Sequence, residues 1–200
     1  MRVVAIGGTG TIGKAVVNEL DERHDVVVVG NQRGDFQCEI TSSESIQNLF
    51  SEVGPFDALV ITTGKIHFAD FSEMSEEEYY VGIKSKLMGQ VNLVRIGSKF
   101  INDNGSFTLT SGILSVDPIR MGSSAAMVNA AIDGFVKGAA IELPRGIRIN
   151  VVSPTVLKES IDKYEDFFRG YEPVHASRVA LAYSKSVEGL QTGQRYTVGY

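Results

Sequence analysis

The chain has 200 residues and a formal net charge of −5 at pH 7. That length suits one domain with a sizeable hydrophobic core. The acidic balance gives no general attraction to nucleic acid or anionic lipid, and no apolar run is long enough to span a bilayer. The single cysteine, Cys38, excludes an internal disulfide and favours a cytoplasmic protein, and its apolar neighbours indicate a core residue.

Short apolar runs alternate with longer segments of helical periodicity along the chain. Strands are expected at residues 3–6, 26–29, 36–40, 58–61, 106–110, 147–152 and 195–198. Helices are expected at residues 13–20, 43–53, 75–100, 125–143 and 176–190. The alternation predicts one α/β domain over residues 1–200, with a Rossmann-type doubly wound parallel sheet between two helical layers.

A glycine-rich turn separates the first strand from the first helix. It reads Gly7-Gly8-Thr9-Gly10-Thr11-Ile12-Gly13. Glycines let the backbone approach a diphosphate, and the following helix N-terminus supplies free N–H groups and a positive dipole end. The turn follows an apolar strand and precedes an amphipathic helix, which predicts dinucleotide binding. A plain glycine-rich strand-to-helix turn is the alternative interpretation.

The segment after the second strand bears on which dinucleotide is bound. Only Gly30 to Asp35 separate the second strand from the third, so a bare loop is expected where a helix is usual. An acidic residue at this strand end would favour NAD by binding the ribose 2′-OH. Asn31 and Arg33 stand there instead, and Arg33 can pair with a 2′-phosphate. NADP(H) is therefore favoured, and Asp35 leaves NAD(H) open.

Several segments, in order along most of the chain, resemble the short-chain dehydrogenase/reductase family. After the glycine turn, the most specific match is the run from Gly146 to Pro154. The resemblance implies that Glu39 and Ile40 pack on the adenine of the cofactor. It implies that the nicotinamide end meets Pro154, Thr155 and Val156.

Two further strand ends carry the resemblance. Thr62, Thr63 and Gly64 stand where the family has part of its Asn-Asn-Ala-Gly motif beside the cofactor. Thr110 and Ser111 stand at the strand end that bears the catalytic serine of the family. The resemblance therefore implies that Ser111 hydrogen-bonds to a substrate carbonyl, although a serine that merely ends a buried strand is the alternative.

The chain departs from the family at its Tyr-x-x-x-Lys pair. Alignment on the run from Ala130 to Gly134 puts Ala125 at the tyrosine position and Asn129 at the lysine position. The family tyrosine passes a proton to the carbonyl oxygen, and the lysine lowers the pKa of that tyrosine. Loss of a general acid costs about 10² to 10⁴ in rate unless another group replaces it.

Two side chains are candidates to replace the missing proton donor. Lys86 stands where the family has the asparagine of Asn-Leu-x-Gly, and a desolvated lysine can act as an acid or base near neutral pH. His67 follows Gly64 at the cofactor edge, and histidine relays protons near neutral pH. An ordinary solvated lysine and an ordinary surface histidine are the alternatives.

Two functions remain open at this point. One is an NADP(H)-dependent oxidoreductase acting on a small carbonyl or alcohol substrate, and the other is an NADP(H)-binding sensor or scaffold without catalysis. An isomerase-like use of the fold is a weaker third. The resemblance implies a homodimer or homotetramer, and Phe167, Phe168 and Tyr171 suggest an apolar cover over the site. No metal site and no nucleic-acid surface are expected from the residue spacing.

Overall fold

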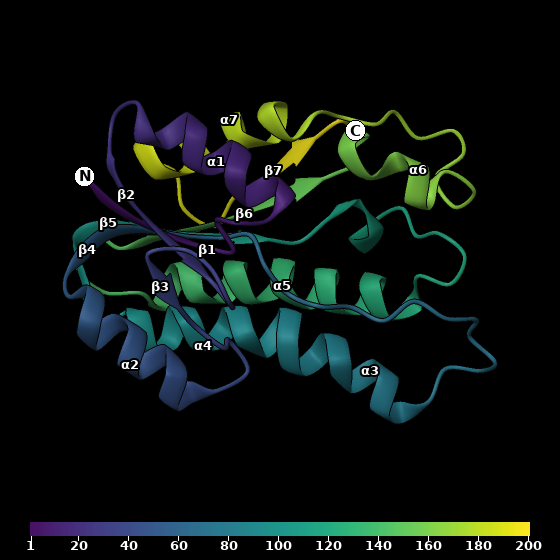
Figure 1. The fold of residues 1–200 in the computed structure, drawn as a ribbon, viewed down its shortest axis with the longest axis horizontal. Coiled ribbons are helices and arrows are strands. Elements are labelled where there is room, and N and C mark those ends of the chain that lie inside the picture. The colour runs from purple at the N-terminus through teal and green to yellow at the C-terminus, as the bar shows by residue number, and fades with distance from the viewer.

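Seven parallel strands form one sheet in the computed structural model, which describes residues 1–200 (Figure 1). They are β1 Arg2–Ile6, β2 Asp25–Gly30, β3 Phe36–Gln37, β4 Phe56–Ile61, β5 Ile101–Thr110, β6 Arg148–Pro154 and β7 Arg195–Val198. Their order across the sheet is β3-β2-β1-β4-β5-β6-β7. The connections reverse direction between β1 and β4, and doubly wound sheets bind ligands at the strand carboxyl ends beside such a point.

Helices cover both faces of the sheet, which confirms the predicted three-layer Rossmann-type fold (Figure 1). One face carries α1 Thr11–Asp21 and α7 Ala176–Glu188. The other carries α2 Ser43–Val53, α4 Met88–Gly97 and α5 Ser123–Glu142, with α3 Glu76–Gly82 in the same layer. A short helix, α6 Ile161–Tyr164, lies in the segment after β6. None of these helices combines the length and apolarity needed to cross a membrane.

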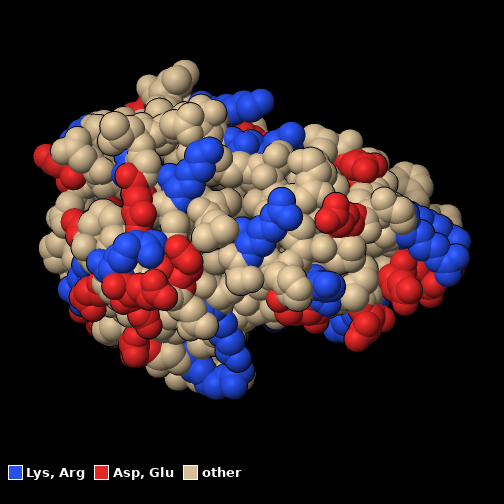
Figure 2. Space-filling view, turned by 90° about the horizontal axis from the view of Figure 1, so that it is seen from above, with Lys and Arg blue, Asp and Glu red and all other residues tan.

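The larger part of the core lies between the sheet and the layer of α2, α4 and α5. The rings of Phe50 and Phe56 stack there with centroids 5.3 Å apart, and both side chains are fully buried. Burial of one such side chain contributes about 1.5 to 3 kcal/mol. On the α1 and α7 face, charges of both signs are interspersed over the surface (Figure 2).

The third strand is shorter than predicted. Only Phe36 and Gln37 pair with β2, so the strand prediction is wrong for residues 38–40. The Glu39 N–H donates to Ser45 Oγ at 3.0 Å, and the Glu39 carboxylate accepts from the Thr41 N–H at 3.1 Å. These bonds turn the chain away from the sheet edge and into α2, whose N-cap is Ser42.

The predicted loop between β2 and β3 is present, and no helix interrupts it. The Asp35 carboxylate accepts from the Val28 N–H at 2.8 Å, and the Asp35 N–H donates to the Val28 carbonyl at 2.8 Å. Asp35 therefore closes the loop directly onto β2. This local pairing lets a short connection stand where a crossover helix is usual.

The predicted helix over residues 75–100 is helical but not uniform. It runs as α3, then as a π-helical turn over Ile83–Leu87, and then as α4, which ends at Gly97. The predicted end at Phe100 is wrong because Phe100 leaves the helix and packs its ring 5.7 Å from that of Phe50. The next strand accordingly begins at Ile101 and not at Ser106.

Candidate cofactor and substrate site

Two adjoining cavities lie at the carboxyl ends of the strands. The first, here the outer crevice, has a volume of about 230 Å³ and lies beside the glycine turn. The second, here the inner cavity, has a volume of about 290 Å³ and lies over the ends of β4, β5 and β6. Thr62 and Thr63, directly after β4, line both cavities. One elongated ligand can therefore occupy the two spaces together.

The outer crevice brings together most residues predicted for the adenine half of a dinucleotide. The predicted residues that line it are Gly7, Thr9, Gly10, Asn31, Glu39, Ile40, Thr62 and Thr63. The prediction missed Lys65, Ser85 and the lining role of Cys38. Cys38 was expected in the core, and its side chain is indeed buried in the larger cluster. Nothing in the local sequence distinguishes Lys65 from an ordinary loop lysine.

The glycine turn is shaped so that side chains would obstruct it. Gly7 has φ of 80°, and a Cβ there would lie 2.8 Å from Thr63 Cβ. A Cβ on Gly13 would lie 2.0 Å from the Gly7 carbonyl oxygen, so Gly13 packs the start of α1 against the turn. The N–H of Gly8 donates to the Val29 carbonyl at 3.2 Å. The close packing of the turn needs glycine.

The N-terminus of α1 is open towards the outer crevice. Its N-cap, Gly10, lines the crevice and supplies no side-chain cap. The N–H of Lys14 makes the first helical bond, to the Gly10 carbonyl at 2.9 Å, so the amides of Thr11, Ile12 and Gly13 precede that bond. A helix start of this kind binds a diphosphate. The residues present therefore fit the dinucleotide that the sequence predicts.

Five predicted site residues line neither cavity. Arg33 is exposed on the loop after β2. His67 lies outside the inner cavity, with its Nε2 3.1 Å from Oε1 of Glu78 on α3. The His67 ring is therefore held outside the cavity in which it was expected to relay a proton. Gly8 and Gly13 also lie outside the linings and act through the close packing of the turn. Thr11, the first residue of α1, lies outside them too.

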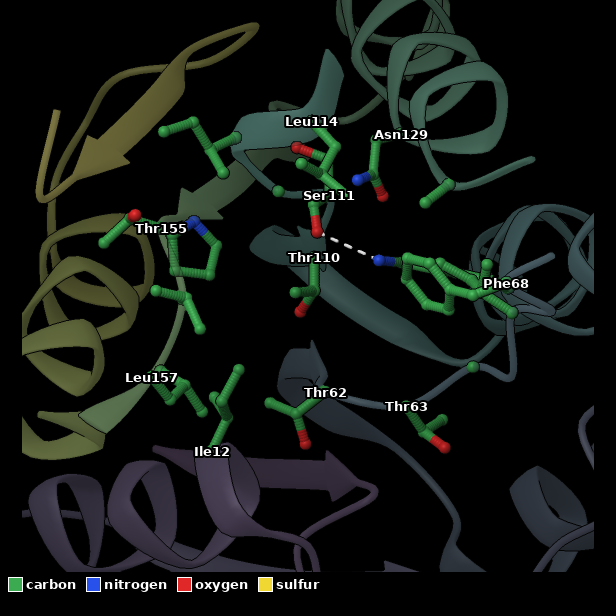
Figure 3. A pocket seen from close by; sticks show the side chains of 18 of the residues that line it. Ile12, Thr62, Thr63, Phe68, Thr110, Ser111, Leu114, Asn129, Thr155 and Leu157 are labelled. Atoms are coloured by element: carbon green, nitrogen blue, oxygen red, sulfur yellow. Dashed lines mark hydrogen bonds between the residues drawn. The ribbon is translucent and has the colours of Figure 1, made fainter. Parts of the chain in front are cut away.

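The inner cavity contains the remaining predicted residues (Figure 3). They are Ile12, Thr62, Thr63, Gly64, Lys86, Thr110, Ser111, Pro154, Thr155 and Val156. Apolar side chains from the segments after β4, β5 and β6 complete the walls. The prediction missed Ile66, Phe68, Ile113, Leu114 and Leu157, because these segments lie outside the regular strands and long helices. Of the three aromatic residues expected to cover the site, Phe168 lines it.

Lys86 reaches the inner cavity from the π-helical turn between α3 and α4. Its Nζ donates to the Ser111 carbonyl at 3.0 Å, which is the dashed bond in Figure 3. Gln90, one helical turn on, donates through Nε2 to the Lys86 carbonyl at 3.1 Å and to the Thr110 carbonyl at 2.9 Å. Lys86 and Ser111, predicted independently, are therefore brought together by direct and indirect bonds.

Burial lowers the pKa of the Lys86 ammonium to about 8, against a partial opposing effect of the Asp133 carboxylate. Desolvation favours the uncharged form of a lysine, and a nearby negative charge favours the charged form. At neutral pH the side chain is therefore still mostly protonated, but it releases a proton far more readily than an exposed lysine.

Several polar atoms in the wall of the inner cavity have no hydrogen-bond partner within the protein. They are Ser111 Oγ from the end of β5, Asn129 Oδ1 from α5, and Thr155 Oγ1 from the end of β6. Figure 3 shows Ser111 and Asn129 close to one another in this wall. Buried polar atoms are nearly always paired, so their gathering indicates a polar ligand. Thr110 differs, because its hydroxyl is engaged by Ile61 and Tyr183.

Helix α5 presents Ala125 and Asn129 to the inner cavity, at the positions where the sequence alignment placed them. Ala125 contributes only a methyl group, and no tyrosine lines the cavity. The one titratable side chain of the lining is Lys86. Any proton exchanged with a ligand by a side-chain acid of this wall would therefore pass through Lys86.

The fold, the glycine turn and the paired cavities together define a dinucleotide-binding α/β domain. A family model described as enoyl-(acyl carrier protein) reductase matches residues 3–187. The chain belongs to the short-chain dehydrogenase/reductase family, a family of oxidoreductases, which confirms the resemblance seen in the sequence.

Relatives in the same family include proteins of solved structure. The protein lin1944 from Listeria innocua is 50% identical with a TM-score of 0.98, and the match covers 99% of each chain. A small-chain dehydrogenase crystallised in complex with NADPH is 27% identical with a TM-score of 0.89, covering 99% of this chain and 96% of that one. The uncharacterised oxidoreductase YmfI of Bacillus subtilis (strain 168) is 29% identical over 124 residues, which are 59% of this chain and 50% of that protein. The match thus spans half the length of that curated relative.

Proposed function

We propose that this chain is an NADP(H)-dependent oxidoreductase that acts on a small carbonyl or alcohol substrate in the inner cavity. The observation that carries the proposal is that Lys86, bonded to the Ser111 carbonyl, lines the same cavity as the unpartnered Ser111 Oγ and Asn129 Oδ1. The residues that fit a nicotinamide line this cavity too. The cofactor, when bound, supplies or accepts the hydride. The protein positions the substrate oxygen and exchanges its proton.

NADP(H) is the proposed dinucleotide. The 27% identical dehydrogenase binds NADPH, which supports the same choice here. At the end of β2, Asn31 lines the outer crevice while the Asp35 carboxylate is bonded to Val28. Arg33 is exposed on the same loop and Lys65 lines the crevice, so two cations are available to a 2′-phosphate.

Lys86 is the proposed proton donor for reduction. Its bond to the Ser111 carbonyl holds the ammonium beside the Ser111 hydroxyl, which would donate a hydrogen bond to the substrate oxygen. A general acid with a pKa near the working pH contributes about 10² to 10⁴ in rate. That contribution replaces the one lost with the family tyrosine. His67 receives no role, because its ring is held by Glu78.

One observation favours a second candidate, a catalytically impaired NADP(H)-binding sensor or scaffold. Ala125 and Asn129 stand in the cavity wall where the family alignment places its tyrosine and lysine. A sensor would bind NADPH through the glycine turn and turn over no carbonyl compound. The two functions are therefore separated by turnover and not by binding.

The test is NADPH oxidation against a panel of aldehydes, ketones and quinones, with wild type, Lys86→Ala and Ser111→Ala. We expect turnover in the wild type, a fall of about 10² or more in each variant, and unchanged NADPH binding. Lys84→Ala is the control, because Lys84 Nζ lies 5.4 Å from the centre of the Tyr80 ring and outside the cavity. NADPH binding without any turnover supports the sensor, and no binding contradicts both functions.

We also propose that the chain forms a homodimer or homotetramer through α5. Met127 and Ile141 are 42% and 87% exposed on this helix. Gly134 and Gly138 lie in the same helical stripe, and a Cβ at either would meet no atom within 4 Å. Exposed apolar side chains beside open glycines suit close packing against a second helix. Light scattering of Ile141→Asp against wild type tests this, with dissociation to a monomer as the expected result.

A further inference from the structure

The Lys86 ammonium has no acidic partner at contact distance. Its one hydrogen bond goes to a neutral carbonyl, that of Ser111. The Asp133 carboxylate influences Lys86 only through its charge, and Asp133 is itself 3.3 Å from Nη1 of Arg195. A cation removed from water is costly unless a negative group compensates it. The inner cavity therefore has an uncompensated positive charge on its wall.

Two N–H donors of the Lys86 ammonium are not used by any protein group. A lysine ammonium has three N–H donors, and one of those of Lys86 is used by the Ser111 carbonyl. The Ser111 hydroxyl and the Asn129 amide lie in the same wall without partners in the protein. Asn129 can present either its oxygen or its NH₂ to a ligand, since the amide orientation follows from its bonding.

Resting on the proposed function, we propose that the substrate is a 2-oxo acid or the corresponding 2-hydroxy acid, whose carboxylate and adjacent oxygen are held together by the ammonium of Lys86. The carbonyl oxygen and one carboxylate oxygen of a 2-oxo acid can turn to the same side of the molecule. A single ammonium can then donate to both. The Ser111 hydroxyl and the Asn129 amide bind the oxygens that remain.

The rest of the lining limits the other end of the substrate. Lys86 is the only charged side chain of the inner cavity, so a second carboxylate would have no cation to meet. Beyond the polar wall the surface is apolar, with Phe68, Leu114 and Phe168 among its residues. The cavity of about 290 Å³ must also admit the nicotinamide. These limits select a monocarboxylate with a short apolar side chain.

The reduction balances with the groups already named. C2 of the 2-oxo acid gains the hydride that NADPH supplies, and the carbon–oxygen double bond becomes single. The carbonyl oxygen takes a proton from the Lys86 ammonium, and the neutral amine regains a proton from water. The products are a 2-hydroxy acid and NADP⁺, and oxidation of the 2-hydroxy acid reverses each step.

Binding of the carboxylate requires the protonated lysine, so it depends on pH. The charged groups on the elements packed against Lys86 are Asp133 on α5, Lys84 on the same π-helical turn, and Lys65, which follows Gly64 in the loop after β4. Asp133 is the one that affects the Lys86 pKa. Affinity for a carboxylate should fall as Lys86 loses its proton above pH of about 8.

The experiment is calorimetric titration with oxamate, an unreactive analogue of a 2-oxo acid, and with its uncharged ethyl ester. NADPH-loaded and cofactor-free protein are both titrated, as wild type, Lys86→Met, Lys86→Arg and Lys84→Met. We expect oxamate to bind at least about tenfold more tightly than the ester, and Lys86→Met to abolish this preference. Lys86→Arg should retain part of the preference because it retains the charge, and Lys84→Met should behave as wild type.

The outcomes separate this inference from the proposed function. Reduction of neutral aldehydes without binding of oxamate, or equal binding by Lys86→Met, overturns the substrate class and leaves the oxidoreductase. Binding of oxamate through Lys86 without turnover of any 2-oxo acid supports the carboxylate site and overturns the reductase. A protein that binds neither NADPH nor oxamate overturns both. Oxamate affinity that does not change between pH 7 and pH 10 contradicts the role of the ammonium.

Discussion

Gly64 lies against the backbone of Lys86, and a Cβ on Gly64 would stand 2.6 Å from Lys86 Cα. The φ of Gly64 is 137°, a conformation that side chains rarely adopt. The next residue, Lys65, donates its N–H to Ser85 Oγ at 3.0 Å. The loop after β4 is therefore fastened to the π-helical turn that carries Lys86. Through this contact the cofactor side of the site and its proton donor are fixed together.

Gly64→Ala should disrupt this contact. We expect a loss of more than about 3 kcal/mol of unfolding free energy, since the strained φ alone costs about 1 to 3 kcal/mol and the overlap adds to it. Gly54→Ala is the control, because Gly54 has φ of 74° and a Cβ there would meet no atom within 4 Å. Urea unfolding of both variants measures the difference. Equal losses would mean that the Lys86 contact contributes nothing beyond strain.

Gln90 should be a positioning residue for the site. Its side chain is fully buried, and it bonds to the Thr110 N–H at 2.9 Å as well as to two carbonyls. Gln90→Leu leaves these backbone groups unpaired at about 1 to 3 kcal/mol for each buried group, so we expect a loss of roughly 3 kcal/mol. Gln47→Leu, at an exposed position of α2, should stay within about 0.5 kcal/mol of wild type.

A structural effect of Gln90 is separated from a catalytic one by kinetics. If Gln90 aligns Lys86 with Ser111, Gln90→Leu should lower kcat for carbonyl reduction at temperatures where the variant is fully folded. NADPH affinity should change little, because Gln90 lines neither cavity. An unchanged kcat in the folded variant would leave Gln90 with a role in stability alone.

Lys86→Met should stabilise the fold in a pH-dependent way. The folded-state pKa of about 8 lies below the ordinary lysine value of 10.5, so burial of the ammonium destabilises the wild type fully below pH 8. At 1.36 kcal/mol per pKa unit, the buried ammonium destabilises the folded state by about 2 kcal/mol, a figure that allows for the partial exposure of the Lys86 side chain. Between pH 8 and 10.5 the unfolded chain binds more protons, so wild-type stability rises towards that of the variant.

The check is urea unfolding of wild type and Lys86→Met at unit steps from pH 7 to pH 10. The informative quantity is the difference in unfolding free energy between the two proteins, because the other groups titrate equally in both. We expect the advantage of the variant to be largest at pH 7 and to shrink above pH 8. A difference that is constant across this range would show that the Lys86 pKa is not displaced in the folded protein.

Arg33→Ala should weaken NADPH binding and leave NADH binding unchanged. A charge-assisted bond to a 2′-phosphate contributes about 1.5 to 3 kcal/mol, and exposure reduces this, so a loss of about tenfold in affinity is expected. Lys99→Ala removes the same charge from an exposed residue before the amino end of β5 and is the control. Equal weakening of NADPH and NADH would assign Arg33 no part in choosing the cofactor.

The sequence allowed prediction of those site residues that directly follow a strand. Gly7, Thr62, Ser111 and Thr155 each come at or just after the end of an apolar run, and parallel strands bring such ends to one edge. The apolar walls were not predictable in the same way. Phe68 comes from a loop whose path depends on tertiary contacts, and no periodicity marks it.

Local hydrogen bonds explain the other differences. Glu39 has an alternating apolar pattern around it, yet its bonds to Ser45 and Thr41 turn it out of the third strand. The π-helical turn at Lys86 has no sequence pattern of its own, because it reflects how α3 and α4 pack. The resemblance nevertheless predicted Lys86 and Ser111 separately as site residues, and the structure brings them together in the inner cavity.

The most direct test of the account is calorimetric titration of the purified protein with NADPH, using wild type, Gly10→Val and Gly54→Ala. A Cβ on Gly10 meets only the Gly7 carbonyl, at 3.3 Å, so the larger side chain should fill the diphosphate position while the fold survives. Gly54 lines neither cavity, and a Cβ there would meet no atom within 4 Å, so it serves as the control. The account predicts NADPH binding by wild type and Gly54→Ala and its loss in folded Gly10→Val. Absence of NADPH binding by the wild type, or equal binding by all three proteins, would contradict it.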